Sequence, residues 1–378
     1  MVSRDGVGSI LLLTRYGRNG SSSRIRCCNY ISSLRHAGFE ITNASFFGDD
    51  YLNQLYQRKP YNYLYFIRDY AKRVRRLLTV KSYDLIWVEK EVLPWLPAWF
   101  ERTLLSGPPV VVDYDDAWSL RYAEHHNFFI RRLLPRKLET IVKSATIVIA
   151  GNPVIADWAR KSGASRVVEI PTVVDLTHYP VKPIPDGPFT VGWIGTPVTE
   201  NYLKIIAGPL RQIQKKFGAR IRVIGGSQDF SIEGVNIDLV PWCESTEANE
   251  LGCCHVGVMP LNDAPWEQGK CGYKLIQYMA SARATVASPV GFNRTIVSNN
   301  HTGFFATSPD DWVGALSMLA TNPELLRNFG SAGRKRVEER FSLNVLAPKI
   351  VQLFCDLLPQ ELASAYRESA ATSSAVIA

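Results

Sequence analysis

The sequence predicts an α/β fold made of two doubly wound parallel-sheet domains. Three observations carry this prediction: the length, the alternation of short β-branched runs with helical segments, and a proline-rich stretch after which that alternation starts again. A chain of 378 residues exceeds one ordinary core, so two domains of roughly 150–200 residues each are expected. With 46% hydrophobic and 21% charged residues, the composition is that of a globular protein.

The first half opens as a parallel sheet should. The apolar run GSILLLTRY predicts a buried strand, and a glycine-containing loop, a helical stretch at 27–39 and a second strand at 40–46 follow it. Further β-branched runs end in polar residues, which is typical of buried parallel strands whose loops leave at the carboxyl end. They lie at 83–91, 108–118, 144–152 and 165–175.

The stretch HYPVKPIPDGPF contains four prolines and is the best linker in the chain. Strands are then predicted at 189–195, 219–227, 235–242, 254–261 and 284–291, and helices at 201–218, 245–252, 272–282, 310–322 and 323–341. The predicted organisation is an N-terminal domain at 1–180, a linker at 181–189, a C-terminal domain at 190–341, and a helix at 342–378 that returns toward the first domain and ends in a frayed tail.

The cysteine content, the lengths of the apolar runs and the net charge indicate where the protein acts and which partners it binds. The seven cysteines include no CxxC pair, so we expect reduced thiols, a cytoplasmic protein and no zinc site. The first apolar run stops at Thr14 and Arg15, which is too short for a signal peptide, and no run approaches the ~20 apolar residues of a membrane span. The net charge of +8 favours an anionic partner: a phosphorylated small molecule, anionic lipid or nucleic acid.

The stretch NDAPWEQGKCG, followed by YKLIQYMA, predicts a polar loop that runs into a helix. A helix N-terminus favours anions, glycines let the backbone approach a phosphate, and Lys270 and Lys274 add positive charge. From the residues alone, a phosphate site and an ordinary helix start with surface lysines are both open.

Beyond these features, GKCGYKLIQYMASARATVASPVGFNRTIVSNNHTGFFA resembles the donor-site signature of the retaining glycosyltransferases of family four, which have the two-domain GT-B fold. GSSSRIRCCNYISSLRHAGFEIT is similar to their N-terminal loop and first helix, and NPELLRNFGSAGRKRVEERFS to their closing helices. The resemblance implies Rossmann-like domains that face each other across a cleft, with the acceptor on the first domain and a nucleotide sugar on the second.

The family places two glutamates in the donor loop, with seven residues between them. Here Gly269 and Gln277 occupy those positions, and Glu267 is the nearest carboxylate that stands in for the first. After the first strand of the second domain, Thr196 replaces an arginine of the family. The donor-binding residues implied by the resemblance are Gly195, Thr196, Lys204, Gly225, Gly269, Lys270, Cys271, Gly272, Tyr273, Lys274, Leu275 and Gln277.

Acidic residues end two strands of the first domain. Asp115, Asp116 and Glu267 are the predicted catalytic residues, with an aspartate orienting the acceptor hydroxyl or taking its proton. Because side chains alternate along a strand, Asp113 and Asp115 should point the same way. The alternative is a helix cap with solvent-facing acids. The predicted acceptor contacts are Arg24, Arg26 and Glu89. For the two arginines, an ordinary surface position is an equally good interpretation.

Two basic helical stretches, YNYLYFIRDYAKRVRRLLTVK and FFIRRLLPRK, mix aromatic and cationic side chains. In the first stretch, Ile67, Ala71, Val74 and Leu78 share one stripe. The sequence is compatible with solvated basic faces or with a peripheral surface that binds anionic membrane lipid. The cations are Arg68, Lys72, Arg75, Arg76, Arg131 and Arg132.

The function these features favour is retaining transfer of a sugar from a UDP-, GDP- or dTDP-sugar to a hydroxyl of a lipid-linked or glycan acceptor. The implied pathway is bacterial surface polysaccharide or lipopolysaccharide synthesis, with no cofactor and no obligatory metal. Rivals are an inactive sugar-nucleotide-binding subunit, a GT-B epimerase or hydrolase, and a basic nucleic-acid-binding protein. Nucleic acid is not expected, because no reader motif is present. A nicotinamide dehydrogenase is disfavoured, because no GxGxxG follows a strand.

Overall fold

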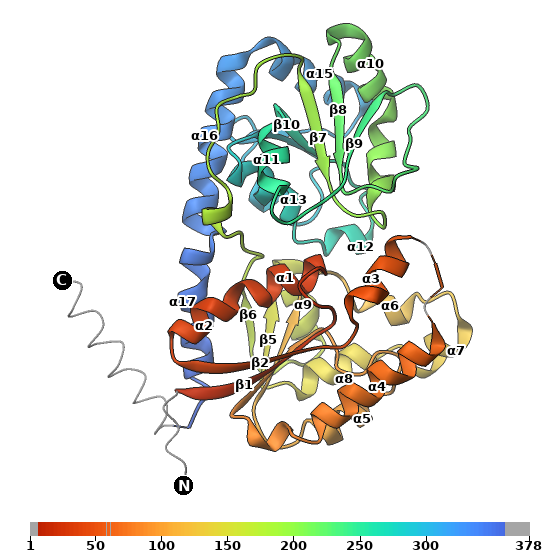
Figure 1. The fold of residues 1–378 in the computed structure, drawn as a ribbon, viewed down its shortest axis with the longest axis vertical. Coiled ribbons are helices and arrows are strands. Elements are labelled where there is room, and N and C mark those ends of the chain that lie inside the picture. Colours follow the sequence, from red (N-terminus) through yellow and green to blue (C-terminus); the bar gives the residue numbers. More distant parts are fainter. Residues whose placement is uncertain (1–6, 58, 61, 360–378) are drawn as a thin grey trace, which may run out of the picture. The chain divides into compact units, whose positions relative to one another are not determined.

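The computed structural model describes residues 7–57, 59–60 and 62–359 (Figure 1), so the tail predicted to fray lies outside the described residues. The chain forms two compact units. The first contains the chain up to Thr172 and the segment from Leu343 onward, and the second runs from Val173 to Ser342.

The boundary between the units differs from the predicted one. Residues 173–180, assigned above to the first domain, belong to the second unit. Val174 forms a parallel bridge with Ser342, and Tyr179 is buried in the core of the second unit. The helix α17 (Leu343–Cys355) belongs to the first unit, where it packs on α2 (Ile31–His36) and the 3-10 turn η1 (Cys28–Tyr30).

The first unit is built on a six-stranded sheet in the order β2-β1-β3-β4-β5-β6, and all neighbouring strands run parallel. The order reverses between β1 and β3, and ligands of open parallel sheets bind outside the carboxyl ends at such a switch point. The strands are β1 (Gly8–Thr14), β2 (Phe39–Ser45), β3 (Leu85–Glu89), β4 (Val110–Tyr114), β5 (Ile147–Ala150) and β6 (Val167–Glu169).

Helices connect these strands on both sides of the sheet (Figure 1). The helix predicted at 27–39 is wrong in its extent. The chain turns earlier, in α1 (Ser21–Arg26), and leaves helical geometry at Cys27, whose ψ of −58° is paired with a φ of −124°. The other helical segments are α3 (Asp49–Tyr56), α4 (Tyr63–Leu77), η2 (Val80–Ser82), α5 (Ala98–Leu104), α6 (Leu120–Ala123), α7 (Phe128–Leu133), α8 (Lys137–Ser144) and α9 (Pro153–Lys161).

The second unit has a parallel sheet in the order β12-β11-β10-β7-β8-β9. Its switch point lies between β7 and β10, which is the doubly wound arrangement expected from the sequence. The strands are β7 (Thr190–Ile194), β8 (Arg220–Ile224), β9 (Ile237–Val240), β10 (Val256–Met259), β11 (Ala284–Ala287) and β12 (Gly303–Phe305).

The predicted helix at 201–218 is two segments, η4 (Glu200–Ile206) and α10 (Ala207–Phe217). Pro209 explains the break, because proline has no N–H to donate and is tolerated only in the first turn of a helix. The remaining segments are η3 (Leu176–His178), α11 (Glu247–Gly252), α12 (Pro265–Gln268), α13 (Tyr273–Ala280), α14 (Asn293–Ile296), α15 (Pro309–Thr321) and α16 (Pro323–Arg340).

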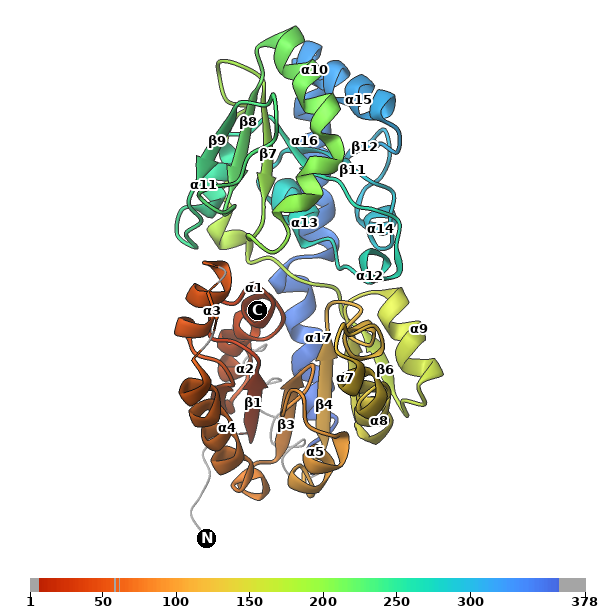
Figure 2. The ribbon, with the colours of Figure 1, turned by 90° about the vertical axis from the view of Figure 1, so that its right-hand side faces the viewer.

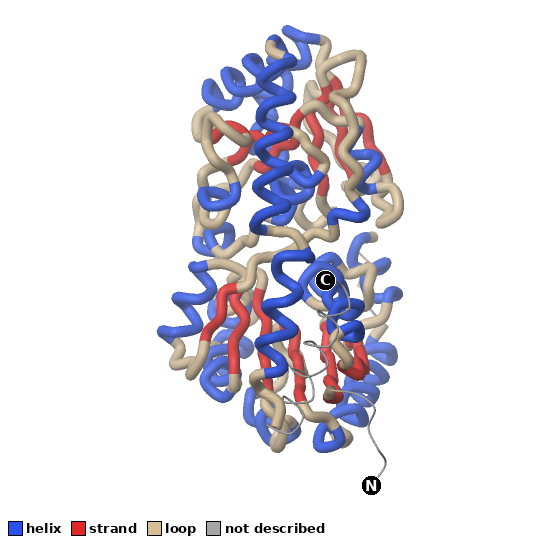
Figure 3. The backbone as a smooth tube through the Cα atoms, turned by 90° about the vertical axis from the view of Figure 1, so that its left-hand side faces the viewer, coloured by secondary structure: helices blue, strands red, loops and turns tan. Residues whose placement is uncertain are grey.

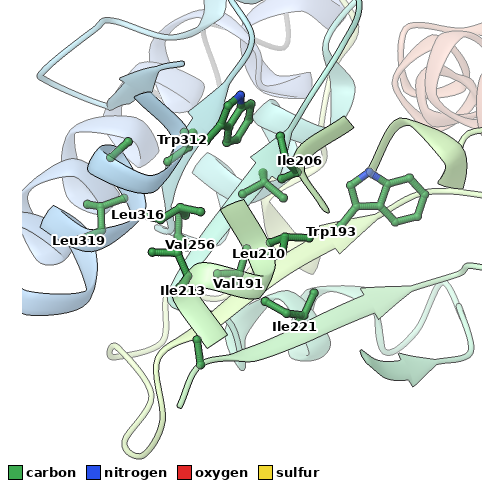
Figure 4. Close-up of a cluster of buried hydrophobic side chains, with 14 of the residues drawn as sticks. Val191, Trp193, Ile206, Leu210, Ile213, Ile221, Val256, Trp312, Leu316 and Leu319 are labelled. Carbon is green, nitrogen blue, oxygen red and sulfur yellow. The ribbon is translucent and has the colours of Figure 1, made fainter. Parts of the chain in front are cut away.

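One face of the second sheet packs against α10 and α15. Alternate residues of β7, β8 and β10 point to this face, as the two-residue period of a strand requires. Figure 4 shows the resulting cluster, in which side chains of the two helices interdigitate with those of the strands. Its labelled members are Val191, Trp193, Ile206, Leu210, Ile213, Ile221, Val256, Trp312, Leu316 and Leu319.

The opposite face carries α13, and Tyr278 fixes that helix to the switch point. Its hydroxyl accepts from the Ile194 N–H at 3.1 Å and donates to the Val258 carbonyl at 3.2 Å, so one side chain joins the ends of β7 and β10. A Cβ at Gly257 would lie 2.1 Å from the Tyr278 ring, so only glycine leaves room for the ring against β10.

Within each unit, helices lie on both faces of the strands, as Figures 2 and 3 show from two sides. In the part of the chain that the structure describes, no helix combines the length and apolarity needed to cross a bilayer.

Replacing Gly257 with alanine tests this packing. We expect Gly257→Ala to lower the free energy of unfolding by about 1–3 kcal/mol, because the added methyl group displaces the Tyr278 ring. Tyr278→Phe should cost about 1–3 kcal/mol, because it leaves two buried backbone groups without their partner. Urea denaturation measures both.

Gly208→Ala is the matched control, because Gly208 lies in α10 with nothing within 4 Å of an added Cβ. It should be neutral or slightly stabilising. A Gly257→Ala protein as stable as the control would contradict this account of the switch point.

Candidate functional site

The second unit gathers two loops at its switch point. The loop after β7 begins with Gly195 and the loop after β8 with Gly225, whose φ is +79°. A Cβ at Gly225 would lie 2.4 Å from the Gly195 carbonyl oxygen, so the two loops touch through their backbones. Buried Glu200 holds the second loop, because its carboxylate accepts from the Ser227 N–H at 2.7 Å.

Two lysines lie at this end of the sheet. Lys274, in the first turn of α13, has its Nζ 4.8 Å from the centre of the Trp193 ring, and a Cβ at Gly195 would lie 2.8 Å from that nitrogen. Lys270 lies before α13, with its Nζ 5.4 Å from the centre of the Tyr202 ring and 5.9 Å from that of Trp266. Both ammonium groups therefore sit on aromatic faces beside the switch-point loops.

Glu267, the predicted substitute for the missing donor-loop glutamate, lies in the short helix α12 and is buried. Its carboxylate accepts from the Tyr202 hydroxyl. Tyr202 therefore touches both Glu267 and Lys270, and it was missed because nothing in the sequence pattern distinguishes it. The structure brings Gly195, Gly269, Lys270, Gly272 and Lys274 to one region around the end of β7 and the start of α13.

Several predicted donor residues take other places. Leu275 has no exposed surface and packs in the core, so its side chain does not reach a ligand. The amide nitrogen of Gln277 donates to the Tyr179 hydroxyl and to Glu247, both at 3.1 Å. Both amide donors of Gln277 are therefore used inside the unit, which leaves only its carbonyl oxygen for the predicted ribose contact.

The other predicted donor residues differ in accessibility. Cys271 is buried, Thr196 and Tyr273 are half-buried, and Lys204 is exposed with its Nζ 5.6 Å from the centre of the Phe230 ring. Thr196 contributes a backbone N–H, which donates to the Thr199 hydroxyl at 3.4 Å.

In the first unit, the ends of β3 and β4 carry buried charges that bond to α1. Arg26 forms a bidentate pair with Asp113, with Nε–Oδ1 at 2.8 Å and Nη2–Oδ2 at 3.2 Å. Burial raises the pKa of Asp113 to about 6, against the opposing effect of Arg26. Glu89 accepts from the Arg15 N–H at 2.8 Å and from the Ser23 hydroxyl.

Arg26 and Glu89 are almost completely buried, at 1% and 0% exposure, so the prediction that their side chains contact the acceptor is wrong. They hold α1 against the switch point between β1 and β3. Arg24 is also buried, and its Nη1 donates to the Arg18 carbonyl at 3.4 Å, which removes the surface-arginine alternative.

Asp115 points to the same helix as Asp113, as the strand alternation predicts. It accepts from the Ser22 hydroxyl and lies 3.0 Å from the Lys90 Nζ. Burial alone would raise the pKa of Asp115, but Lys90 and Ser22 outweigh it and hold the pKa below its usual value. Asp115 is therefore an ionised carboxylate and a weak base. Asp116, half-buried, follows it and accepts from the Trp118 N–H through its carbonyl at 2.7 Å.

A second buried network lies beside these residues. Glu91 accepts from the Tyr122 hydroxyl at 2.6 Å and pairs with Lys137 at 2.8 Å and Arg15 at 3.1 Å. Lys137 also pairs with Glu101 at 2.8 Å. These charges come from segments far apart in the sequence, and no local pattern predicts that they meet.

The two regions suit different tasks. The second unit offers lysines, close backbone approach and a helix N-terminus, which together suit an anion such as a diphosphate. The first unit offers carboxylates that are already paired. Within residues 7–57, 59–60 and 62–359, no group of three His, Cys, Asp or Glu side chains is arranged to hold a metal ion.

Residues 188–322, a little over a third of the chain, match the family model described as glycosyl transferases group 1. No curated protein sequence matches the chain.

Many solved structures have this fold. One is sucrose-phosphate synthase from Thermosynechococcus elongatus, with a TM-score of 0.71 and 17% sequence identity; the match covers 92% of this chain and 98% of that chain. Another is Anabaena HepE solved with UDP-glucose, with a TM-score of 0.69 and 14% sequence identity; the match covers 92% of this chain and 100% of that chain. A glycosyltransferase from Rickettsia africae gives 0.65 and 14%, with 93% of this chain and 99% of that chain covered. Identities this low show the fold alone, and that fold is GT-B, as the sequence predicts.

Breaking the Arg26–Asp113 pair should be strongly destabilising. We expect Arg26→Met to cost about 3–5 kcal/mol in the free energy of unfolding, because it leaves the buried Asp113 carboxylate without its charged partner. Arg26→Met combined with Asp113→Leu should recover much of that loss, since no unpaired charge remains.

Arg160→Met is the matched control. Arg160 pairs with Glu169 at 2.9 Å, but the two side chains are 54% and 39% exposed, so we expect a cost below about 1 kcal/mol. Chemical denaturation measures all three proteins. Equal effects of Arg26→Met and Arg160→Met would contradict the structural role given to Arg26.

Proposed function

We propose that this protein transfers a sugar from a nucleotide-diphosphate sugar to an acceptor hydroxyl and retains the anomeric configuration. One observation carries the proposal: the segment that matches the group 1 glycosyltransferase model, 188–322, contains both glycine loops, both lysines and α13. Anabaena HepE, which has the same fold, was solved with UDP-glucose and with UDP, which favours a UDP-sugar as the donor among UDP-, GDP- and dTDP-sugars.

In the proposed reaction, the bond between the sugar and the diphosphate breaks and negative charge develops on the leaving oxygen. Lys270 and Lys274 lie where they would neutralise that charge, and the N-terminal end of α13 adds its positive dipole. The tight contact between Gly195 and Gly225 keeps side chains out of the space that the diphosphate needs.

The proton of the acceptor hydroxyl needs a destination. Asp115 is a weak base, because Lys90 and Ser22 hold its pKa low, and Asp113 is committed to Arg26. We therefore assign the proton to the leaving phosphate oxygen, on the face from which the acceptor attacks. This front-face path accounts for retention without a strong enzymatic base.

Glu267 is the proposed contact for the transferred sugar in place of the glutamate that Gly269 lacks. Its carboxylate is held by Tyr202, whose ring also carries the Lys270 ammonium group, so the sugar and diphosphate contacts share one support. We propose that the reaction belongs to bacterial surface polysaccharide or lipopolysaccharide synthesis, takes place in the cytoplasm and needs no obligatory metal.

A membrane surface on α4 and α7 belongs to this proposal. The side of α4 that faces the unit carries Asp69, Arg73 and Leu77, whereas Leu64 and Ile67 are 70% and 50% exposed. Burial lowers the pKa of Arg73 to about 9. A helix that buries charges and exposes apolar side chains favours an apolar partner.

The charges on these helices favour anionic lipid as that partner. In α7, Phe128, Phe129 and Leu133 are 59–73% exposed and lie on either side of Arg131 and Arg132 in the sequence. The exposed basic residues of the two helices are Arg68, Lys72, Arg75, Arg76, Arg131 and Arg132. Aromatic and aliphatic side chains enter the interface while the cations meet the lipid headgroups, which suits a lipid-linked acceptor.

The donor site is tested by thermal shift with UDP, GDP, dTDP, CMP and their sugars. A nucleotide at about 100 times its dissociation constant adds ~2.7 kcal/mol of stability, so one family should raise the melting temperature by several degrees. In Lys270→Met/Lys274→Met, affinity for that nucleotide should fall at least about tenfold, because two charges that face the diphosphate are lost.

Lys215→Met/Lys216→Met is the matched control, since both lysines are exposed on α10. No shift with any nucleotide in the wild type would favour the inactive or nucleic-acid-binding alternatives. Equal nucleotide affinities in the two double variants would show that Lys270 and Lys274 do not contact the diphosphate.

Membrane binding is tested by flotation with phosphatidylglycerol–phosphatidylcholine vesicles at low salt. Arg75→Glu/Arg76→Glu should weaken binding at least about tenfold, because each cation near the surface contributes ~1 kcal/mol. Lys215→Glu/Lys216→Glu makes the same charge change on α10 and should have little effect. Wild-type protein that stays with the soluble fraction would contradict the membrane surface.

A further inference from the structure

Three cations surround one indole ring in the first unit. The Arg121 guanidinium carbon lies 4.4 Å from the centre of the Trp118 ring, the Lys90 Nζ 4.5 Å and the Arg15 guanidinium carbon 4.8 Å. Arg121 also lies 4.8 Å from the centre of the Trp95 ring, so it is held between two tryptophans. Like charges crowd together in this way only where something offsets their repulsion.

Two of the three cations have carboxylate partners. Arg15 pairs with Glu91, and Lys90 pairs with Asp115 and lies 3.4 Å from Glu89. In the described part of the chain, Arg121 has no carboxylate within ion-pair distance, and its Nε is buried without a hydrogen-bond partner. Glu91 acts on Arg121 from farther away, but its oxygens already serve Arg15, Lys137 and Tyr122.

The surroundings of Arg121 are accessible and aromatic. Its side chain is half-buried, as are Tyr16, Tyr51 and Trp95. Tyr16 and Tyr51 lie close enough to interact electrostatically with Arg121. Tyr16 follows β1, and Trp118 follows β4, so this region adjoins the switch point of the sheet, where ligands of parallel sheets bind.

We infer that Arg121 binds an anionic group, a phosphate or a carboxylate, on the acceptor. The inference rests on the proposed function for its biological meaning, because it makes the acceptor a negatively charged molecule. Burial, the largest effect, and the neighbouring Arg15 both lower the pKa of Arg121, so an anion would relieve the desolvation and the repulsion together. A guanidinium group matches either oxyanion through two parallel N–H donors, and the aromatic rings offer faces against which a sugar packs.

The test is a titration of the full chain with sodium pyrophosphate and, separately, sodium glucuronate, against sodium chloride at equal ionic strength. Tryptophan fluorescence reports binding, because Arg121 lies on Trp95 and Trp118. We expect a saturable change with at least one probe and at least a tenfold loss of affinity in Arg121→Gln. Arg121→Lys should recover part of that loss, and Arg160→Gln, at an exposed arginine of α9, should bind as the wild type does.

The two probes separate the sources of the anion. Binding of pyrophosphate alone identifies a phosphate-bearing ligand, and binding of glucuronate alone identifies an acidic sugar. Absence of a response with both probes, or equal responses of wild type and Arg121→Gln, would overturn the inference. So would a response that disappears in Lys270→Met/Lys274→Met and survives in Arg121→Gln, because the probe would then occupy the second unit.

A parallel measurement of UDP binding keeps the two proposals apart. Arg121→Gln should retain the wild-type thermal shift with UDP. If no nucleotide binds but the Arg121-dependent response persists, the sugar-transfer proposal fails and the anion site stands.

Discussion

The Tyr278 ring packs directly on the backbone of Gly257, and this contact sets how closely α13 approaches β10. The hydroxyl of the same side chain joins the Ile194 N–H of β7 to the Val258 carbonyl of β10, so the helix is tied to both strands of the switch point. This fixes where α13 begins and therefore where Lys274 reaches the Gly195 loop. An anion site needs such support, because charge stabilisation depends on donors that are already in place.

The first unit holds many buried charges at the ends of its parallel strands, and each of these charges needs a partner. The ends of β3 and β4 contribute Glu89, Asp113 and Asp115, and α1 supplies Ser23, Arg26 and Ser22 as their partners. Such pairs contribute little net stability over apolar residues, but removal of one partner is costly. Lys90 and Ser22 hold the pKa of Asp115 below its usual value, so this carboxylate is a weak base, which is consistent with a reaction whose leaving group takes the proton.

Apart from β12, which was not predicted, the strands and the fold class were predictable, because β-branched runs that end in polar residues mark buried parallel strands whatever their tertiary contacts. Helix limits were not. The break at Cys27 and the 3-10 segment before Pro209 depend on local backbone geometry that apolar periodicity does not report. The helices α3, α5, α6, α8 and α9 were missed because each spans only four to nine residues, which is too short for a helical period to stand out in the sequence.

For the site, the resemblance located the lysines and glycines of the second unit but assigned side-chain roles by position alone. Leu275 and Gln277 face the interior, and that depends on how α13 is rotated against the sheet. The buried roles of Arg26, Glu89 and Lys137 were not predictable, because their partners come from distant segments. In α4 the apolar residues Leu64 and Ile67 are exposed while Arg73 is buried, which reverses the usual amphipathic pattern.

The central claim is that the switch point of the second unit binds the nucleotide diphosphate of a sugar donor. Hydrogen–deuterium exchange with and without a saturating nucleotide tests it most directly, because it maps protection along the chain. The account predicts slower exchange in the Gly195 and Gly225 loops and at 267–275, and little change in β9. Protection confined to other segments would contradict the claim, as would no protection with UDP, GDP or dTDP.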